Sequence, residues 1–166
     1  GPWLKPPFLQ SAQNHNLYIV GENRVQETLD KLSNNTVLDN LEIHLIGHLQ
    51  SNKVNKAVNI FDVIQTVDSL KLAQKINNAA KQINKVQNIY MQINVGNDPN
   101  KHGFHNNDVI HAAKTIDSLS NVYLTGIMMI PPLIDMDKNY RNIFQQTKLL
   151  QLEIYNSGIK NCVHIS

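Results

Sequence analysis

Short apolar runs alternate along the chain with longer stretches in which apolar residues recur every three or four positions. Runs of about four to eight mostly apolar residues, bounded by Gly, Pro or polar residues, are typical of buried strands. Such runs predict strands at residues 17–20, 42–47, 63–67, 89–95, 123–130 and 162–165. The stretches between them predict helices at residues 23–32, from about 51, from 70, from 107, and at 139–155.

This alternation of strands and helices predicts a parallel sheet, because parallel neighbours need a crossover connection that is usually a helix. Two closures satisfy the pattern: an open doubly wound sheet, and part of a (β/α)₈ barrel. The apolar pattern alone does not separate them. A complete eightfold barrel typically needs about 250 residues, and this chain of 166 residues is short for one.

The composition predicts a single globular domain, with 42% hydrophobic and 17% charged residues. The net charge of +2 is spread along the chain and leaves no concentrated basic surface for nucleic acid. Cys162 is the only cysteine, and no apolar run approaches the roughly 18 residues of a membrane span. The first residues also lack the basic-then-apolar order of a signal peptide. We therefore expect a cytoplasmic protein without a nucleic-acid or membrane partner.

The segments that follow the predicted strands are the candidates for function, since both parallel architectures bind ligands at the C-terminal ends of their strands. These segments are polar, rich in side-chain amides and supplied with Gly; they are residues 21–24, 47–53, 94–103, 128–132 and Ser166. The His and Cys residues show no metal-ligand spacing, and there is neither a GxGxxG string nor a Walker loop. The sequence thus predicts a ligand site without a metal, and argues against a dinucleotide or P-loop enzyme.

Each candidate residue also has a purely structural interpretation. Asn23 is placed to cap the helix that it precedes, and His48 is consistent with a hydrogen-bonded structural histidine. His44 stands between two apolar residues, which favours packing in the interior, and Met128 suits barrel filling. From the residues alone, only a soluble α/β domain with a polar rim is established.

Five strings, in order along the chain, resemble motifs of the pyridoxal 5′-phosphate (PLP) homeostasis family, small proteins related to the N-terminal barrel of bacterial alanine racemase. They are GENRVQE at 21–27, HLIGHLQSNK at 44–53, TVDSLKLA at 66–73, QINV with KHG at 92–103, and GIMMI at 126–130. The resemblance implies a (β/α)₈ TIM-type barrel of the alanine racemase N-terminal type. It also implies that the barrel is incomplete, with about six βα units and without the first and last strands.

Members of this family bind PLP as a Schiff base to a Lys at the end of the first strand, and hold its phosphate with loops after the seventh and eighth strands. They show no settled catalytic activity and are thought to buffer the cofactor or hand it over. The resemblance therefore implies a PLP-binding protein of intracellular PLP homeostasis, without catalytic turnover, catalytic residues or a metal. It also favours a monomer, with self-association through open sheet edges as the alternative.

The resemblance implies cofactor contacts from Asn23, His48, Met128 and Ser166, of which Ser166 matches the start of the phosphate loop. Lys5 is the sole Lys before Gly21, which makes it the only candidate for the Schiff base. It lies about three residues too near Gly21, and two prolines follow it directly. We therefore expect Lys5 not to take the Schiff-base position, and the chain to bind PLP weakly and reversibly.

The resemblance divides the chain into residues 1–16, an arm in place of the family's first strand, and residues 17–166, a partial PLP-binding barrel. Two other functions stay open. One is a truncated or non-functional barrel fragment that does not bind PLP. The other is a racemase-like PLP enzyme. The absent Lys argues against it, and so does the absence of the second domain, which supplies the opposing acid–base group in alanine racemase.

Overall fold

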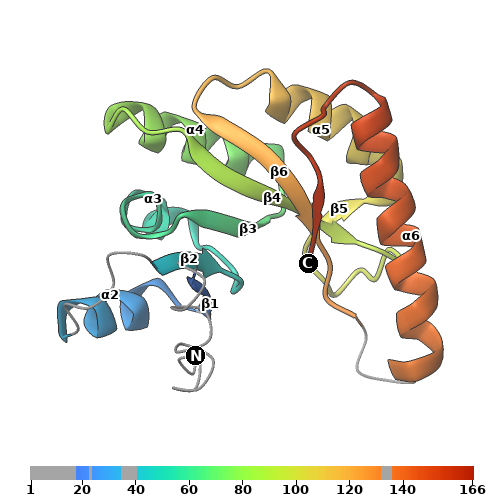
Figure 1. Cartoon of the computed structure of the whole chain (residues 1–166), viewed down its shortest axis with the longest axis horizontal. Helices are drawn as coiled ribbons and strands as arrows, with labels where there is room; N and C mark the ends of the chain where they lie inside the picture. Colours follow the sequence, from blue (N-terminus) through green and yellow to red (C-terminus); the bar gives the residue numbers. More distant parts are fainter. Residues whose placement is uncertain (1–17, 23, 35–40, 132–135) are drawn as a thin grey trace.

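The structure of the chain, a computed structural model, describes residues 18–22, 24–34, 41–131 and 136–166. Within these residues, strands and helices alternate as the sequence predicts (Figure 1). The strands are β1 (Tyr18–Glu22), β2 (Leu41–Leu45), β3 (Val63–Val67), β4 (Gln87–Asn94), β5 (Phe104–His105), β6 (Val122–Met128) and β7 (His164–Ile165). The helices are α2 (Val25–Asn34), α3 (Val54–Ile60), α4 (Leu70–Gln82), α5 (Val109–Asp117) and α6 (Met136–Asn156), with 3₁₀ turns η1 (Ser51–Lys53) and η2 (Asn106–Asp108).

All strands of the described residues belong to one parallel sheet in the order β1-β2-β3-β4-β6-β7, with the short β5 paired to β4. The prediction of six parallel strands in sequential order is therefore confirmed. β5 was not predicted, because its two residues lie in a polar loop and carry no apolar run. Within the described residues, β1 and β7 each pair on one side only, so the sheet is a part of a barrel rather than a closed one.

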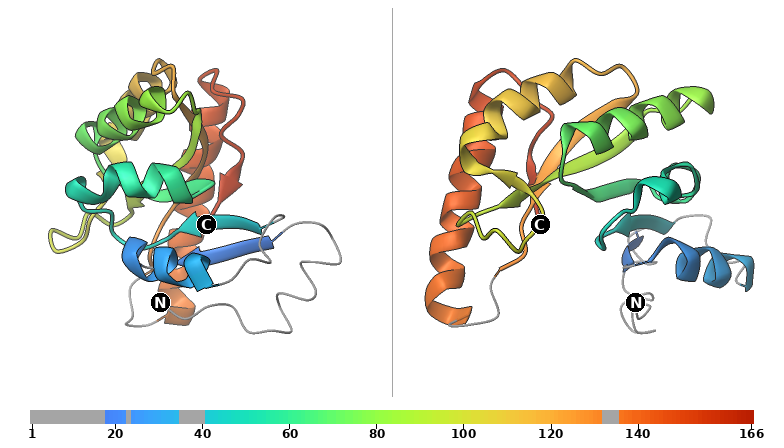
Figure 2. Two further views of the ribbon diagram at one scale, coloured as in Figure 1. Left: turned by 90° about the vertical axis from the view of Figure 1, so that its left-hand side faces the viewer. Right: turned by 180° about the vertical axis from the view of Figure 1, so that it is seen from behind.

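The helices decide between the two closures that the sequence left open. Successive helices contact one another, α2 with α3, α3 with α4, α4 with α5, and α5 with α6. A doubly wound sheet would instead place helices on both faces. The helices follow one face of the curved sheet (Figure 2), as in a (β/α) barrel.

The main hydrophobic core lies between the sheet and these helices. Ile64, Ile89 and Ile127 are fully buried there, on β3, β4 and β6, together with Ala73 and Ile76 of α4. The helix α4 begins as predicted, because the Ser69 side chain accepts a hydrogen bond from the Leu72 backbone N–H at 3.1 Å. None of the helices in the described ranges has an apolar stretch that could cross a bilayer.

Candidate functional site

The C-terminal ends of the parallel strands all lie at one edge of the sheet, and three of the predicted site residues stand there. His48 lies just after β2, Met128 is the last residue of β6, and Ser166 follows β7. Lys5 and Asn23 lie outside the described residues, as does the predicted arm at residues 1–16. The site is therefore built from the loops at this edge, which we call the mouth of the barrel.

Ser166 is held at the mouth by backbone hydrogen bonds to the neighbouring strand. Its N–H donates to the Ile127 carbonyl at 2.9 Å, and its own carbonyl accepts from the Met129 N–H at 3.0 Å. These bonds extend the β6–β7 pairing by one residue and set Ser166 beside Met128. The Ser166 residue is exposed at the mouth.

The loop between β4 and β5 folds back over the end of its own strand. The buried Asn94 side chain donates to the carbonyls of Asp98 (2.7 Å) and Lys101 (3.2 Å), and accepts from the Asp98 N–H at 3.1 Å. Gly103 has φ +126°, and a Cβ there would lie 2.6 Å from the Asn94 backbone nitrogen. Only Gly fits this close approach, which fixes where the preceding residue, His102, stands.

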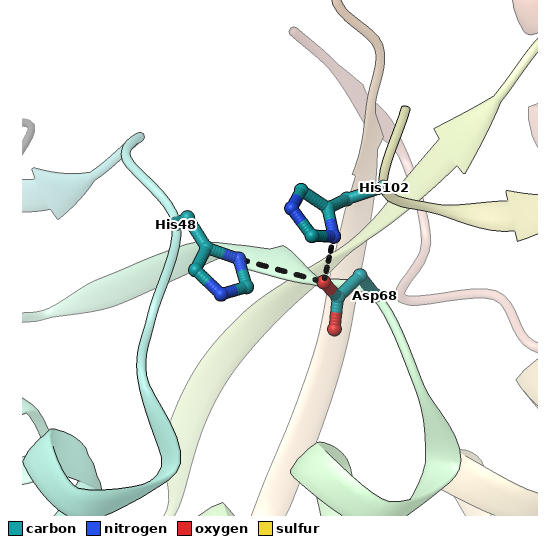
Figure 3. Close-up of side chains that lie close together, drawn as sticks. All are labelled: His48, Asp68 and His102. Carbon is teal, nitrogen blue, oxygen red and sulfur yellow. Dashed lines mark ion pairs between the residues drawn. The ribbon is translucent and has the colours of Figure 1, made fainter. Parts of the chain in front are cut away.

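His48, Asp68 and His102 come together at the mouth (Figure 3). The Nδ1 atoms of His48 and His102 lie 3.7 Å and 3.6 Å from the same Asp68 carboxylate oxygen. The two rings are stacked, with centroids 4.3 Å apart and planes 17° from parallel. The two histidine side chains are 49% and 64% exposed, whereas Asp68 is 14% exposed.

The sequence predicts His48 as a cofactor contact or a structural residue, and it assigns no chemical role to Asp68 or His102. Metal-ligand motifs are recognised by short separations along the chain, whereas His48, Asp68 and His102 are far apart in the sequence. These three residues are brought together by parallel strands whose C-terminal ends converge, and no local spacing encodes that. The signal available in the sequence was their position, because each follows a predicted strand.

Below the mouth, the inner face of the sheet carries a layer of hydrogen-bonded polar side chains. The Gln65 amide donates to His44 Nδ1 at 2.8 Å, and His44 Nε2–H donates to the Glu42 carboxylate at 2.6 Å. His44 is 3% exposed, so the prediction that it packs in the interior is confirmed. The Tyr90 ring meets the His44 ring edge-on, with centroids 6.2 Å apart.

Met128 and Tyr90 close this layer. Met128 is buried in a small cluster with Val63 and Tyr90, so its interpretation as barrel filling agrees with its position. Burial raises the pKa of the Tyr90 hydroxyl, and the nearby Glu42 carboxylate raises it further. Among the described residues, the side chains beneath the mouth thus form a packed and hydrogen-bonded layer.

Two hollows flank the mouth. One, of about 380 Å³, follows β1 and β2 and is lined by Arg24, Val25, Gln26, His48, Gln50 and Lys53. The other, of about 190 Å³, lies at the end of β4 and includes Gln92, Asn94, Lys101, His102 and Ile130 in its lining. His48 lines the first hollow and His102 the second. Both hollows combine cationic and amide groups, which suit an anionic ligand.

Known proteins resemble this chain over nearly its whole length. The alanine racemase N-terminal domain family matches residues 7–166. A curated relative from Aquifex aeolicus, named pyridoxal phosphate homeostasis protein, is 34% identical over 98% of this chain and 71% of its own length. A second relative of that name, from Buchnera aphidicola, is 34% identical over 84% of this chain and 64% of its own length.

Solved structures agree with the fold. PipY of Synechococcus elongatus, determined without PLP, is 31% identical and superposes with a TM-score of 0.86 over 96% of this chain and 74% of its own. The same protein with PLP bound is 29% identical, with a TM-score of 0.84 over 95% of this chain and 73% of its own. An alanine racemase from Clostridium difficile, at 19% identity and a TM-score of 0.72 over 95% of this chain and 39% of its own, shares the fold alone.

The chain thus spans about two thirds of the length of the first two curated relatives. The predicted barrel type agrees with both the family match and the superpositions. Where the structure describes them, the strings that carried the resemblance span the C-terminal ends of strands and the segments that follow. From its matched residues and its fold, the chain belongs to the alanine racemase N-terminal domain family, among the pyridoxal phosphate homeostasis proteins.

Proposed function

We propose that the chain binds pyridoxal 5′-phosphate reversibly at the mouth of the barrel and serves in intracellular homeostasis of this cofactor, without catalytic turnover. The observation that carries the proposal is the 34% identity to the Aquifex homeostasis protein over 98% of the chain. A protein of the same fold, PipY, has been solved with PLP bound. The name of the relative and the ligand of PipY support the proposal by similarity.

The donors at the mouth fit the chemistry of the cofactor's phosphate and polar ring substituents. Ser166 is an exposed residue with a hydroxyl group, and its backbone is fixed against β6. His48, Arg24 and Lys53 line the hollow at the ends of β1 and β2, whose cationic groups favour an anionic cofactor nearby. We assign the phosphate of the cofactor to the side of Ser166. We assign contacts with its pyridine ring to His48 and Met128.

We infer reversible binding from the Lys amines that are available for a covalent link to the cofactor. A covalent link to the cofactor needs a Lys amine that can lose its proton, and desolvation in a barrel interior favours that loss. Among the described residues, the inner layer consists of side chains other than Lys, namely Glu42, His44, Val63, Gln65, Tyr90 and Met128. Lys5 is followed by two prolines, which disfavour a regular strand. The absence of turnover is proposed on the same ground, together with the names of the relatives.

Equilibrium dialysis against PLP, with pyridoxal as the matched ligand that lacks the phosphate, tests the proposal. We expect saturable binding of one PLP per chain, much weaker binding of pyridoxal, and weaker PLP binding by Ser166→Ala and His48→Ala. Absence of saturable PLP binding by the unaltered chain would refute the proposal.

Borohydride reduction followed by peptide mapping tests the reversible character separately. We expect Lys5 to be labelled no more than the exposed Lys56. The total label per chain should be equal in the Lys5→Ala and Lys56→Ala variants. Specific labelling of Lys5, abolished by Lys5→Ala and not by Lys56→Ala, would return Lys5 to the covalent role and contradict the weak-binding prediction.

A further inference from the structure

We infer that His48, Asp68 and His102 form a binding site for one divalent transition-metal ion of the zinc class at the mouth of the barrel. The site goes beyond cofactor binding: it shares His48 with the proposed PLP contacts, but Asp68 and His102 take no part in them. It reverses the expectation from the sequence that the chain has no metal site. The inference rests on donor geometry, on how the three loops are fixed, and on donor chemistry.

The separations between the donor atoms suit a shared metal better than direct hydrogen bonds. An N–H···O hydrogen bond spans about 2.7–3.2 Å, but His48 Nδ1 and His102 Nδ1 lie 3.7 Å and 3.6 Å from the Asp68 oxygen. Zinc bound at about 2.0–2.2 Å to each donor in a tetrahedron separates its donors by roughly 3.4 Å. One donor atom from each of the three residues lies within 4.8 Å of the others, so small rotations complete the site.

Both imidazoles present Nδ1 to the same carboxylate oxygen from stacked rings (Figure 3). Stacked rings do not yet aim their lone pairs at one point, so at least one ring must turn for both to bind one ion. Their side chains are 49% and 64% exposed, which leaves both rings space to turn. The same exposure leaves room for water to complete the coordination shell, as in zinc sites with three protein ligands.

The backbone beneath each donor is fixed, which limits what has to move. Asp68 lies between the fully buried strand β3 and Ser69, the N-cap of α4. The loop of His48 is tied to β3 by the Thr66 hydroxyl, which donates to the Gly47 carbonyl at 2.7 Å. His102 is set by the close approach of Gly103 to β4. The fixed backbones therefore limit the rearrangement on metal binding to rotations of the side chains.

The donor set also selects the class of ion. Two imidazoles and one carboxylate suit zinc and the neighbouring transition metals, whereas magnesium and calcium prefer sites made only of oxygen atoms. The carboxylate offsets one of the two charges of the ion, and the neutral imidazoles add none. Protons compete with the metal for both imidazoles, so binding must weaken in acid.

Calorimetric titration of the full chain with Zn²⁺ at pH 7.5, and visible absorption with Co²⁺, test the inference. We expect one high-affinity Zn²⁺ per chain, a Co²⁺ spectrum of a low-symmetry site with nitrogen ligands, and no response to Mg²⁺. His48→Ala, His102→Ala and Asp68→Asn should each weaken Zn²⁺ binding by at least about 100-fold, because even outer partners of metal ligands are worth 10- to 100-fold. Binding should also fall steeply when the titration is repeated at pH 5.5.

His111→Ala is the matched control, because His111 is an exposed histidine on α5 and should leave the affinity unchanged. Circular dichroism of every variant establishes that the fold is kept, which the exposure of both histidines favours. Unaltered Zn²⁺ affinity in the double variant His48→Ala/His102→Ala, or no saturable Zn²⁺ binding by the unaltered chain, would overturn the inference. PLP dialysis on Asp68→Asn separates the two sites, because loss of Zn²⁺ with PLP binding retained supports the metal site alone.

Discussion

Replacing Gly103 by Ala tests how the loop after β4 is fixed at the mouth. Gly103 has φ +126°, a backbone conformation that costs a residue with a side chain about 1–3 kcal/mol. The added Cβ would also lie 2.6 Å from the Asn94 nitrogen and 2.9 Å from the Ile93 carbonyl carbon. Both are backbone atoms of β4, so no change of rotamer relieves the overlap.

The two contributions add. Forcing extra atoms into a packed site costs about 1–3 kcal/mol, so Gly103→Ala should lower the free energy of unfolding by about 2–6 kcal/mol in all. In urea denaturation with a slope of about 2 kcal/mol per molar, the midpoint should fall by roughly 1–3 M. The slope itself should stay unchanged, because the substitution alters neither state's exposed surface appreciably.

Gly96→Ala is the matched control in the same loop. Gly96 also has a positive φ, +95°, but a Cβ there would meet no atom within 4 Å. It therefore carries the conformational cost without the overlap, and should shift the midpoint by clearly less than Gly103→Ala. Equal shifts for the two variants would refute the view that the approach of Gly103 to β4, rather than its backbone conformation, fixes the loop.

Two further predictions concern the interior and the loop. Burial raises the pKa of the Cys162 thiol to about 12; since the unfolded thiol ionises near 9, its contribution to stability is complete below pH 9 and is lost as the pH rises toward 12. The urea midpoint of the unaltered chain should therefore fall more steeply between pH 8.5 and 10.5 than that of Cys162→Ala, and parallel curves would contradict this. Asn94→Ala removes three hydrogen bonds of the 94–103 loop. The backbone amide protons of this loop should therefore exchange at least about tenfold faster, the factor that corresponds to a loss of about 1.4 kcal/mol in the free energy of local opening. Unchanged exchange in the loop would show that Asn94 does not hold it.

The order of elements was predictable because each strand carries a nearly continuous apolar run. All five residues of β3 are buried, and its predicted limits agree with the structure. β4 begins two residues before its predicted start, at Gln87, which is fully buried. Its amide donates to the carbonyls of Phe61, Asp62 and Asn88 at 3.1 Å. A polar residue buried by such bonds is invisible to a search for apolar runs.

The predicted C-terminal limits of two strands are wrong, and these strands end where their pairing with a neighbouring strand stops. β6 was predicted to reach residue 130, but it ends at Met128, near where its pairing with the short β7 stops. β2 was predicted to reach Gly47 and ends at Leu45, and the next residue, Ile46, is 37% exposed. Pairing partners are far away in the sequence, so the apolar pattern carries no signal for these limits.

The same physical reason explains what the sequence disclosed about the mouth and what it did not. Parallel strands joined by helices bring the residue after every strand to one edge, which made His48, Met128 and Ser166 candidates one by one. Which of those residues meet depends on loop conformation: Thr66 holds the loop of His48, and Gly103 holds that of His102. A meeting of three donors from three loops is therefore a property of the folded chain. The proposed cofactor contacts came from strings along the sequence, whereas the proposed metal site required the structure. PLP dialysis tests the first proposal, and Zn²⁺ titration tests the second.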